Sequence, residues 1–247
     1  MSQNNMYHRC RTAPSEVRFR LRREAFFGCC KCGNPLIENA HIIEYPITKQ
    51  FPIEDMLALC PNCHTEADLG YYPKFVLRDL KQNPFNKNKR YLQKRFVVTG
   101  EKLIINTGSS RFINTERIFT INDFDLVSIT RKEGLYLSLN INLFDKYNRL
   151  IALIYDNFWI VDRSYLWDVE YKPQHLILRK KSRDIVLDIQ IKNEEIFLRG
   201  NLYYNGFLIP IKPQNMSIGG VTIRNFTIEN AGGGISIQVP QYRPRIY

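Results

Sequence analysis

Two cysteine-rich stretches decide how the first part of this chain folds: FGCCKCG at residues 27–33 and LALCPNCH at residues 57–64. Each stretch holds two cysteines separated by two residues, among turn-forming glycine, proline and asparagine. That gap lets one tight turn direct two thiolates at one ion, and two such turns complete a tetrahedral zinc site. We therefore predict a structural Zn²⁺ site with four cysteine ligands: Cys29, Cys32, Cys60 and Cys63.

The remaining cysteines are Cys10 and Cys30, which we expect to be free thiols. Cys30 could replace Cys29 as a ligand, although only one residue separates it from Cys32. All six cysteines lie in the first quarter of the chain, whereas a secreted disulfide framework would be spread more widely. The N-terminus has no apolar signal segment, so we expect a reducing, cytoplasmic location.

Composition and charge set the broad class of the protein. The chain has 247 residues, of which 44% are hydrophobic and 24% are charged, which excludes a disordered or collagen-like chain. It contains no run of about 18 apolar residues, so we expect no membrane partner. Thirty-five Lys and Arg against 24 Asp and Glu give a net charge of +11, which favours a polyanionic partner such as DNA.

Three helices are predicted in the cysteine-rich part. Residues 15–26, SEVRFRLRREAF, form a helix with Ser15 as its N-cap and Val17 and Leu21 on its apolar face. Arg18 and Arg22 lie one turn apart beside that face. We predict that these two arginines contact DNA phosphates, the alternative being a solvated surface. A second helix begins near Pro61 and ends near Gly70, and a third covers residues 74–81.

Read together, FGCCKCGNPLIENAHI (27–42) and DMLALCPNCHTEADLG (55–70) resemble the HNH endonucleases of the ββα-metal superfamily, in the branch with a zinc-knuckle frame. The resemblance covers roughly residues 15–82. It rests on the two knuckles, a histidine between them, and a histidine directly after the fourth cysteine. It implies a ββα-metal domain that hydrolyses DNA phosphodiester bonds with a catalytic Mg²⁺ or Mn²⁺ ion.

The resemblance also assigns roles to individual residues. His41, at the end of the LIENAH strand, becomes the general base, since a neutral imidazole can accept a proton from water. His64 and Asp68 are four residues apart on one helix face and would hold the divalent ion, which stabilises charge on the scissile phosphate. His64 could instead support or replace a zinc ligand, and His41 could be an ordinary packed histidine.

Two residues depart from the family pattern. Asp55 stands where the family usually has Asn, and its carboxylate could accept a hydrogen bond from His41 Nδ1 and orient the ring for catalysis. Ala40 occupies a position that often supplies a metal ligand, so the ion must depend on His64, Asp68 and either Asp55 or Glu38. These departures support an alternative function, a catalytically inactive zinc module that binds nucleic acid.

The rest of the chain follows a different pattern. Residues 83–96 are polar and basic and predict a linker. Beyond them, apolar residues alternate with a period of two at 135–144 and 185–192, and short turns recur at regular spacing. We predict a mainly antiparallel β domain over residues 97–247, with a sandwich favoured over a β-helix. The one β-helix-like stretch is residues 219–237, and Trp159 and Trp167 are expected to pack internally.

The chain as a whole is therefore expected to be α+β, with a zinc-stabilised ββα-metal domain at residues 1–82 followed by the β domain. The β domain contains no cysteine and no Gly-rich phosphate loop. We expect it to serve in targeting, sensing or assembly, as a homo-oligomer or with a protein partner. A carbohydrate-binding role is the further alternative, suggested only by residues 219–237.

Overall fold

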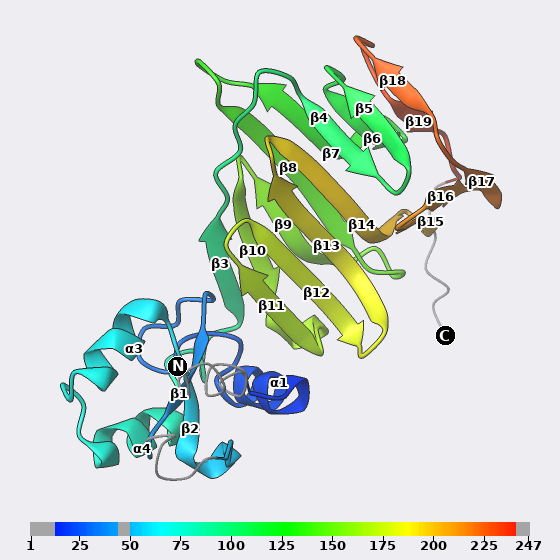
Figure 1. Ribbon diagram of the computed structural model, residues 1–247. Coiled ribbons are helices and arrows are strands. Elements are labelled where there is room, and N and C mark those ends of the chain that lie inside the picture. Colours follow the sequence, from blue (N-terminus) through cyan, green and yellow to red (C-terminus); the bar gives the residue numbers. More distant parts are fainter. Residues whose placement is uncertain (1–12, 44–49, 241–247) are drawn as a thin grey trace, which may run out of the picture. The chain divides into compact units, whose positions relative to one another are not determined.

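The computed structural model describes residues 13–43 and 50–240 (Figure 1). Its contacts divide the chain into two compact units, with the boundary between Arg90 and Tyr91. All α-helices of the described residues belong to the first unit, and the second is built of strands. The described residues contain no helix that is long and apolar enough to cross a membrane.

The first unit is a hairpin with helices. Its elements are α1 (Ser15–Glu24), β1 (Glu38–His41), the 3₁₀ turn η2 (Ile53–Asp55), β2 (Met56–Leu59), α3 (Pro61–Asp68) and α4 (Lys74–Gln82). The helices expected near Pro61 and over residues 74–81 are confirmed. The strand order β1, β2 followed directly by α3 places the second cysteine pair at the start of a helix, where Pro61 is favourable because the first helical N–H needs no partner.

The expected cap of α1 is wrong by one residue. Ser15 is the first helical residue and Pro14 occupies the N-cap position, with no side-chain cap. The Pro14 carbonyl accepts the first helical hydrogen bond, from the Arg18 N–H at 3.0 Å. The apolar face is as predicted, because Leu21 is buried with Met56 and Val17 packs against them.

The β1–β2 hairpin separates two small apolar layers. In its antiparallel register Ala40 lies opposite Leu57, and His41 lies opposite Met56. Since side chains alternate across a strand, these two pairs face opposite sides. Ala40 and Leu57 pack with the buried cysteines and with Leu77 of α4, whereas Met56 packs with α1.

The stretch expected to be a linker, residues 83–96, is shared between the two units. The Phe85 N–H donates to the carbonyl of Cys30 at 2.9 Å, and Asn86 is only 3% exposed, so this part packs on the first knuckle. From Tyr91 the chain is already a strand of the second unit. The separation therefore falls inside the basic stretch.

The second unit contains seventeen described strands and one 3₁₀ turn. They are β3 (Tyr91–Arg95), β4 (Ile104–Thr107), β5 (Ser110–Ile113), β6 (Arg117–Ile121), β7 (Phe124–Arg131), β8 (Leu137–Phe144), β9 (Leu150–Tyr155), β10 (Phe158–Asp162), η3 (Arg163–Tyr165), β11 (Asp168–Lys172), β12 (His175–Lys181), β13 (Asp184–Lys192), β14 (Glu195–Tyr204), β15 (Phe207–Lys212), β16 (Asn215–Ile218), β17 (Val221–Ile223), β18 (Thr227–Glu229) and β19 (Ile235–Ile237).

Most neighbouring strands in this unit are antiparallel. One series runs β3, β10, β9, β8, β7, β6, and another is the meander from β11 to β17. Strand β14 connects them, because it also pairs with β4 in parallel and meets β8. The short strands β18 and β19 add in parallel to β5 and β6. The expected mainly antiparallel β domain is confirmed.

Tight turns explain why neighbouring strands pair in sequence. Asp156 and Asn157, between β9 and β10, have φ of 47° and 67°, and Asn193 and Glu194, between β13 and β14, have φ of 51° and 61°. Two successive residues with positive φ form the hairpin turn whose twist matches that of the strands, and Asn and Asp tolerate this conformation best. The Asp, Asn and Glu residues at these positions therefore form the short turns that we expected between strands.

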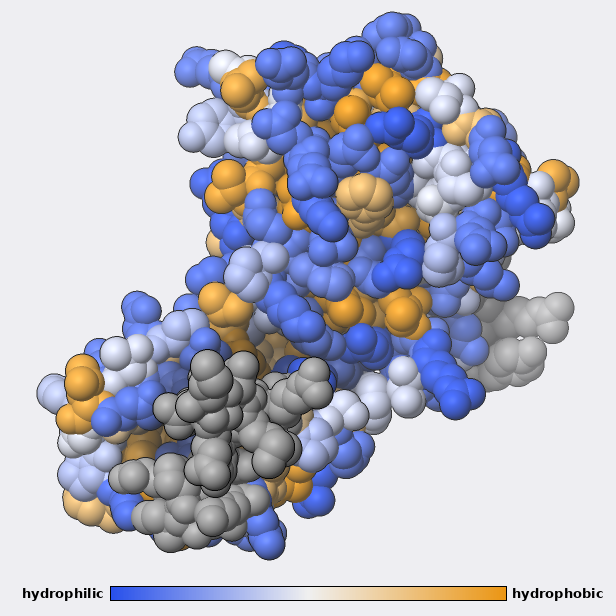
Figure 2. All heavy atoms as spheres, viewed as in Figure 1, coloured by the Kyte–Doolittle hydropathy of each residue, from blue (hydrophilic) through white to orange (hydrophobic). Residues whose placement is uncertain are grey.

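The core of the second unit is aliphatic and aromatic. Trp159 is fully buried, and its ring centroid lies 5.4 Å from that of Tyr171. The expectation that Trp159 packs internally is confirmed, whereas Trp167 is half-buried. In the view of Figure 2, hydrophilic residues cover most of the surface of this unit and apolar residues occur in separate patches.

Candidate metal centre and histidine site

Four cysteines converge in the first unit. The sulfur atoms of the four predicted ligands, Cys29, Cys32, Cys60 and Cys63, all lie within 4.8 Å of one another. The Sγ atoms of Cys32 and Cys60 lie 3.6 Å apart. Within residues 13–43 and 50–240 this is the only group of three or more Cys, His, Asp or Glu side chains arranged to hold a metal ion.

Local backbone structure forms the two knuckles. In the first, the Gly33 N–H donates to the Cys29 carbonyl at 2.8 Å, which closes a turn around the cysteine pair. Gly33 has a φ of +77°, a conformation that favours glycine. In the second, the His64 N–H donates to the Cys60 carbonyl at 2.8 Å and opens α3. Each knuckle is thus closed by a hydrogen bond between residues only four apart in the sequence.

The electrostatics of the cluster favour a bound cation. Burial raises the pKa of the Cys29 thiol to about 12 and also raises the pKa of Cys63. Burial acts in the same direction on Cys60, but hydrogen bonds from Cys63 and the other cysteines outweigh it and lower the pKa of Cys60. Several thiolates this close together need positive charge to stabilise them. Four sulfur donors fit a zinc ion, which is bound with release of the thiol protons.

The structure also decides between Cys29 and Cys30. Cys29 belongs to the cluster, whereas Cys30 is 3% exposed and packs in the adjoining apolar core. Its N–H donates to the Ala58 carbonyl at 2.8 Å, which ties the backbone of the first knuckle to strand β2. Burial raises the pKa of the Cys30 thiol to about 11. Cys10 lies outside the described residues.

His41 ends strand β1, as expected. Its ring is half-buried, with its centroid 5.7 Å from that of Phe51. Burial lowers the pKa of His41, a hydrogen bond with the backbone of Gln50 acts in the opposite direction, and the electrostatic interaction with His64 lowers the pKa further. The imidazole is therefore neutral at pH 7, as a proton acceptor must be. Its Nε2 atom, however, is shielded from solvent.

His64 lies between two carboxylates. Its Nδ1 is 2.8 Å from Oε2 of Glu38 on β1, and its Nε2 is 3.7 Å from Oδ1 of Asp68, one turn further along α3. The structure thus brings together the expected pair and adds Glu38, which the sequence left as one of two candidates. Glu38 and Ala40 lie on the same face of β1. The Glu38 carboxylate is therefore supplied two residues before Ala40, whose side chain has no ligand atom.

Asp55 is placed differently from the expectation. Its Oδ1 accepts a hydrogen bond from Arg78 Nη2 of α4 at 2.9 Å. The contact with the His41 region comes instead from its backbone, because the Asp55 carbonyl accepts from the Ile42 N–H at 2.8 Å. The role of Asp55 as the carboxylate that orients His41 stays a prediction. Sequence reasoning missed Arg78, since no local pattern links residues 23 apart.

The arginines of α1 differ in exposure. Arg18 and Arg22, the predicted phosphate contacts, are half-buried beside the apolar face, and Arg18 Nε is shielded from solvent. Arg20 and Arg23 are exposed. Arg20 and Arg23 are therefore the more accessible pair of arginines on this helix, and phosphate contact by Arg18 and Arg22 stays a prediction.

Comparisons of this chain with protein-family models, with curated proteins and with solved structures found no match. The four converging cysteines and the carboxylate-flanked His64 are therefore the observations on which a function for the first unit rests.

Proposed function

We propose that the first unit is a metal-dependent HNH-type endonuclease that hydrolyses DNA phosphodiester bonds. The observation that carries the proposal is the placement of the two histidines on a strand–strand–helix frame. His41 ends β1, and His64 lies on α3 between Glu38 and Asp68. The cysteine cluster at the start of α3 would hold this frame together through a structural Zn²⁺ ion.

The surroundings of His64 suit a histidine that binds a metal. With Nδ1–H donated to Glu38, the tautomer is fixed and Nε2 keeps its lone pair on the side of Asp68. His64 and Asp68 would then hold Mg²⁺ or Mn²⁺, and Glu38 would orient the ring. When bound, such an ion stabilises the charge that develops on the scissile phosphate.

His41 would accept the proton of the attacking water. Its lowered pKa keeps it neutral, which is the state a general base requires. Since Nε2 is shielded from solvent, cleavage requires the ring to rotate or its surroundings to open when DNA binds. This requirement is specific to the catalytic hypothesis.

The test compares plasmid nicking by the zinc-loaded full chain with and without added Mg²⁺ or Mn²⁺. We expect His41→Ala to slow the metal-dependent reaction by about 10²–10⁴-fold, the usual contribution of a general base. Asn39→Ala is the matched control, because Asn39 lies on the same face of β1 two residues earlier and is also half-buried. Nicking that survives His41→Ala unchanged would contradict the mechanism.

A second candidate function is a zinc module that binds nucleic acid without cutting it. Two observations favour it: the position of Ala40, which cannot bind metal, and the shielded Nε2 of His41. In that case the wild-type chain would bind DNA but show no cleavage with any divalent ion. His41→Ala would then leave DNA affinity unchanged, and the Arg20→Ala/Arg23→Ala double variant would lower it.

A further inference from the structure

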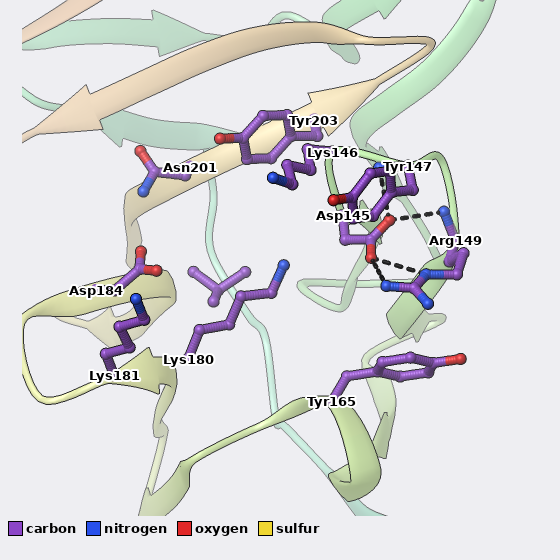
Figure 3. A pocket seen from close by; sticks show the side chains of 11 residues that line it. Asp145, Lys146, Tyr147, Arg149, Tyr165, Lys180, Lys181, Asp184, Asn201 and Tyr203 are labelled. Atoms are coloured by element: carbon purple, nitrogen blue, oxygen red, sulfur yellow. Dashed lines mark hydrogen bonds and ion pairs between the residues drawn. The ribbon is translucent and has the colours of Figure 1, made fainter. Parts of the chain in front are cut away.

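The second unit contains a basic, aromatic pocket of about 400 Å³, a volume in the range of small-ligand sites. It lies between the β8–β9 turn, the turn η3, the β12–β13 hairpin and strand β14 (Figure 3). Its lining includes three lysines and three tyrosines: Lys146, Lys180, Lys181, Tyr147, Tyr165 and Tyr203. None of these residues belongs to the first unit, so the pocket is separate from the histidine site.

The basic side chains of the pocket lining, three lysines and Arg149, outnumber its two carboxylates, Asp145 and Asp184. In the described part of the chain, no carboxylate lies within ion-pair distance of the ammonium groups of Lys146, Lys180 or Lys181. In Figure 3, Lys146 and Lys180 extend toward each other across the pocket. Ammonium groups that line one pocket favour an anion there.

The arginine of the pocket, Arg149, by contrast forms an ion pair with Asp145. Asp145, whose side chain is 3% exposed, accepts hydrogen bonds from Arg149 Nε at 2.9 Å and Arg149 Nη2 at 2.6 Å. Asp145 also accepts from the backbone N–H groups of Tyr147 and Arg149, at 2.9 and 3.0 Å. These four bonds fix the β8–β9 turn. The Asp145 carboxylate thus makes its hydrogen bonds within the turn, and its charge also attracts the ammonium group of Lys146.

The same arginine positions two of the tyrosines. Its guanidinium carbon lies 5.3 Å from the ring centroid of Tyr147 and 4.9 Å from that of Tyr165. Tyr147 nevertheless remains 55% exposed. The pocket therefore offers ordered aromatic surface next to ammonium groups. Proteins that bind single-stranded nucleic acids combine these two features, because bases stack on aromatic rings while basic side chains contact the phosphates.

We propose that this pocket binds a nucleotide unit, with the phosphate at Lys146 and Lys180 and the base against Tyr147. The unit can belong to a single strand of nucleic acid or be a free nucleotide, since both present the same base and phosphate. The proposal does not depend on whether the first unit cuts DNA.

The first test measures binding of a fluorescently labelled oligothymidylate to the zinc-loaded full chain, without added Mg²⁺ or Mn²⁺, by anisotropy. The Lys180→Ala/Lys181→Ala double variant is expected to bind at least about tenfold more weakly and to show a shallower salt dependence, by roughly 0.7 per lost phosphate contact. Lys192→Ala/Lys212→Ala is the matched control. It removes the same charge from exposed positions of the same sheet, outside the pocket.

Equal loss of affinity in the two double variants, or no binding by the wild type, would overturn the proposal. Unchanged tryptophan emission in each variant shows that the second unit is folded, so that loss of binding reports on the pocket. The nuclease proposal is unaffected by either result, because it is tested by His41→Ala in the first unit.

The second test addresses the base and the source of the nucleotide. Tyr147→Ala should weaken binding about five- to tenfold or more, since stacking contributes roughly 1–3 kcal/mol per base, whereas Tyr147→Phe should bind like the wild type. Displacement of the oligonucleotide by a 5′-mononucleotide identifies a free nucleotide as the ligand, and displacement only by oligonucleotides identifies a strand. Equal displacement by inorganic tripolyphosphate, with Tyr147→Ala binding normally, would overturn recognition of a base.

Discussion

At the scale of single residues, two glycines show how the same backbone conformation can have different consequences. Gly33 and Gly70 have φ of +77° and +78°. A Cβ on Gly33 would lie 2.4 Å from Phe85 Cδ1 and 2.5 Å from Asn86 Oδ1, whereas a Cβ on Gly70 would meet nothing within 4 Å. Gly33 therefore serves both the turn and the close packing of the 84–89 segment on the first knuckle.

We predict that Gly33→Ala destabilises the first unit more than Gly70→Ala does. The shared cost of positive φ for alanine is about 1 kcal/mol, and the contact with Phe85 and Asn86 should add roughly 1–3 kcal/mol at Gly33. Urea unfolding of the zinc-loaded protein, followed by helical circular dichroism, measures both. Equal destabilisation would show that Phe85 and Asn86 move aside without cost.

Asp188 is a second residue whose role depends on its surroundings. It is 4% exposed on β13, where it bonds to His175 Nε2 at 2.8 Å and to Arg199 Nη2. Burial by itself would raise the pKa of Asp188, but the hydrogen bond of His175 and the charge of Arg199 outweigh burial and lower that pKa below 3.8. The charged carboxylate thus links strands β12, β13 and β14.

Because the pKa of Asp188 is lowered on folding, its contribution to stability is complete above the unfolded pKa near 3.8 and is lost as the pH falls through the folded pKa. We predict that Asp188→Asn lowers the free energy of unfolding at pH 7 by about 2–4 kcal/mol and flattens the acid loss of stability. Unfolding followed by tryptophan fluorescence at pH 7 and below pH 4 measures this. Asp123→Asn, in an exposed turn, is the control and should behave like the wild type.

At the scale of elements, the first unit illustrates how far local patterns reach. Three features of this unit are encoded by neighbouring residues: the cysteine spacing, the proline at the start of α3 and the apolar face of α1. The structure contains the helix that begins at Pro61 and the buried face of α1, as expected. The N-cap of α1 moved from Ser15 to Pro14, because Ser15 already has the helical conformation and a serine inside the helix cannot cap it. Boundaries of this kind depend on the dihedral angles of single residues.

The cysteine cluster gives the element-scale prediction. Cys63→Ser should lose most of its bound zinc and the helical signal of α3, because Cys63 is one of the four converging thiols at the start of that helix. Cys30→Ser should retain zinc, since Cys30 lies outside the cluster. Zinc content by atomic absorption after gel filtration distinguishes the two variants. Loss of zinc in Cys30→Ser alone would show that the ligand set is different.

At the scale of the whole molecule, the two units carry separate spectroscopic reporters. The chain has two tryptophans, Trp159 and Trp167, and both lie in the second unit. The described α-helices α1, α3 and α4 all lie in the first. Helical circular dichroism and tryptophan emission therefore observe different units of one chain.

We predict that a strong zinc chelator reduces the helical ellipticity at 222 nm but leaves the tryptophan emission maximum unchanged. We expect the first unit, which has a small apolar core, to depend on the metal, whereas the second has an extensive core of its own. Thermal unfolding followed by tryptophan emission should keep its midpoint within about 2 °C after chelation. A large shift in that midpoint would show that the second unit depends on the zinc-bound first unit.

The sequence by itself determined the features that short segments encode. These are the two cysteine knuckles, the helices near Pro61 and over residues 74–81, His41 at a strand end, and the alternating strands of the second unit. Such features follow from turn geometry and from the periods of strands and helices, so a few neighbouring residues suffice.

Only the tertiary structure decided which distant groups meet. It placed Cys29 rather than Cys30 in the cluster, Glu38 at His64 and Arg78 at Asp55. It also assembled the lysine–tyrosine pocket from turns and strands between residues 145 and 203. The physical reason is that these contacts depend on strand register and on the packing of helices against the hairpin, which sum many weak interactions over the whole chain and leave no short pattern in the sequence.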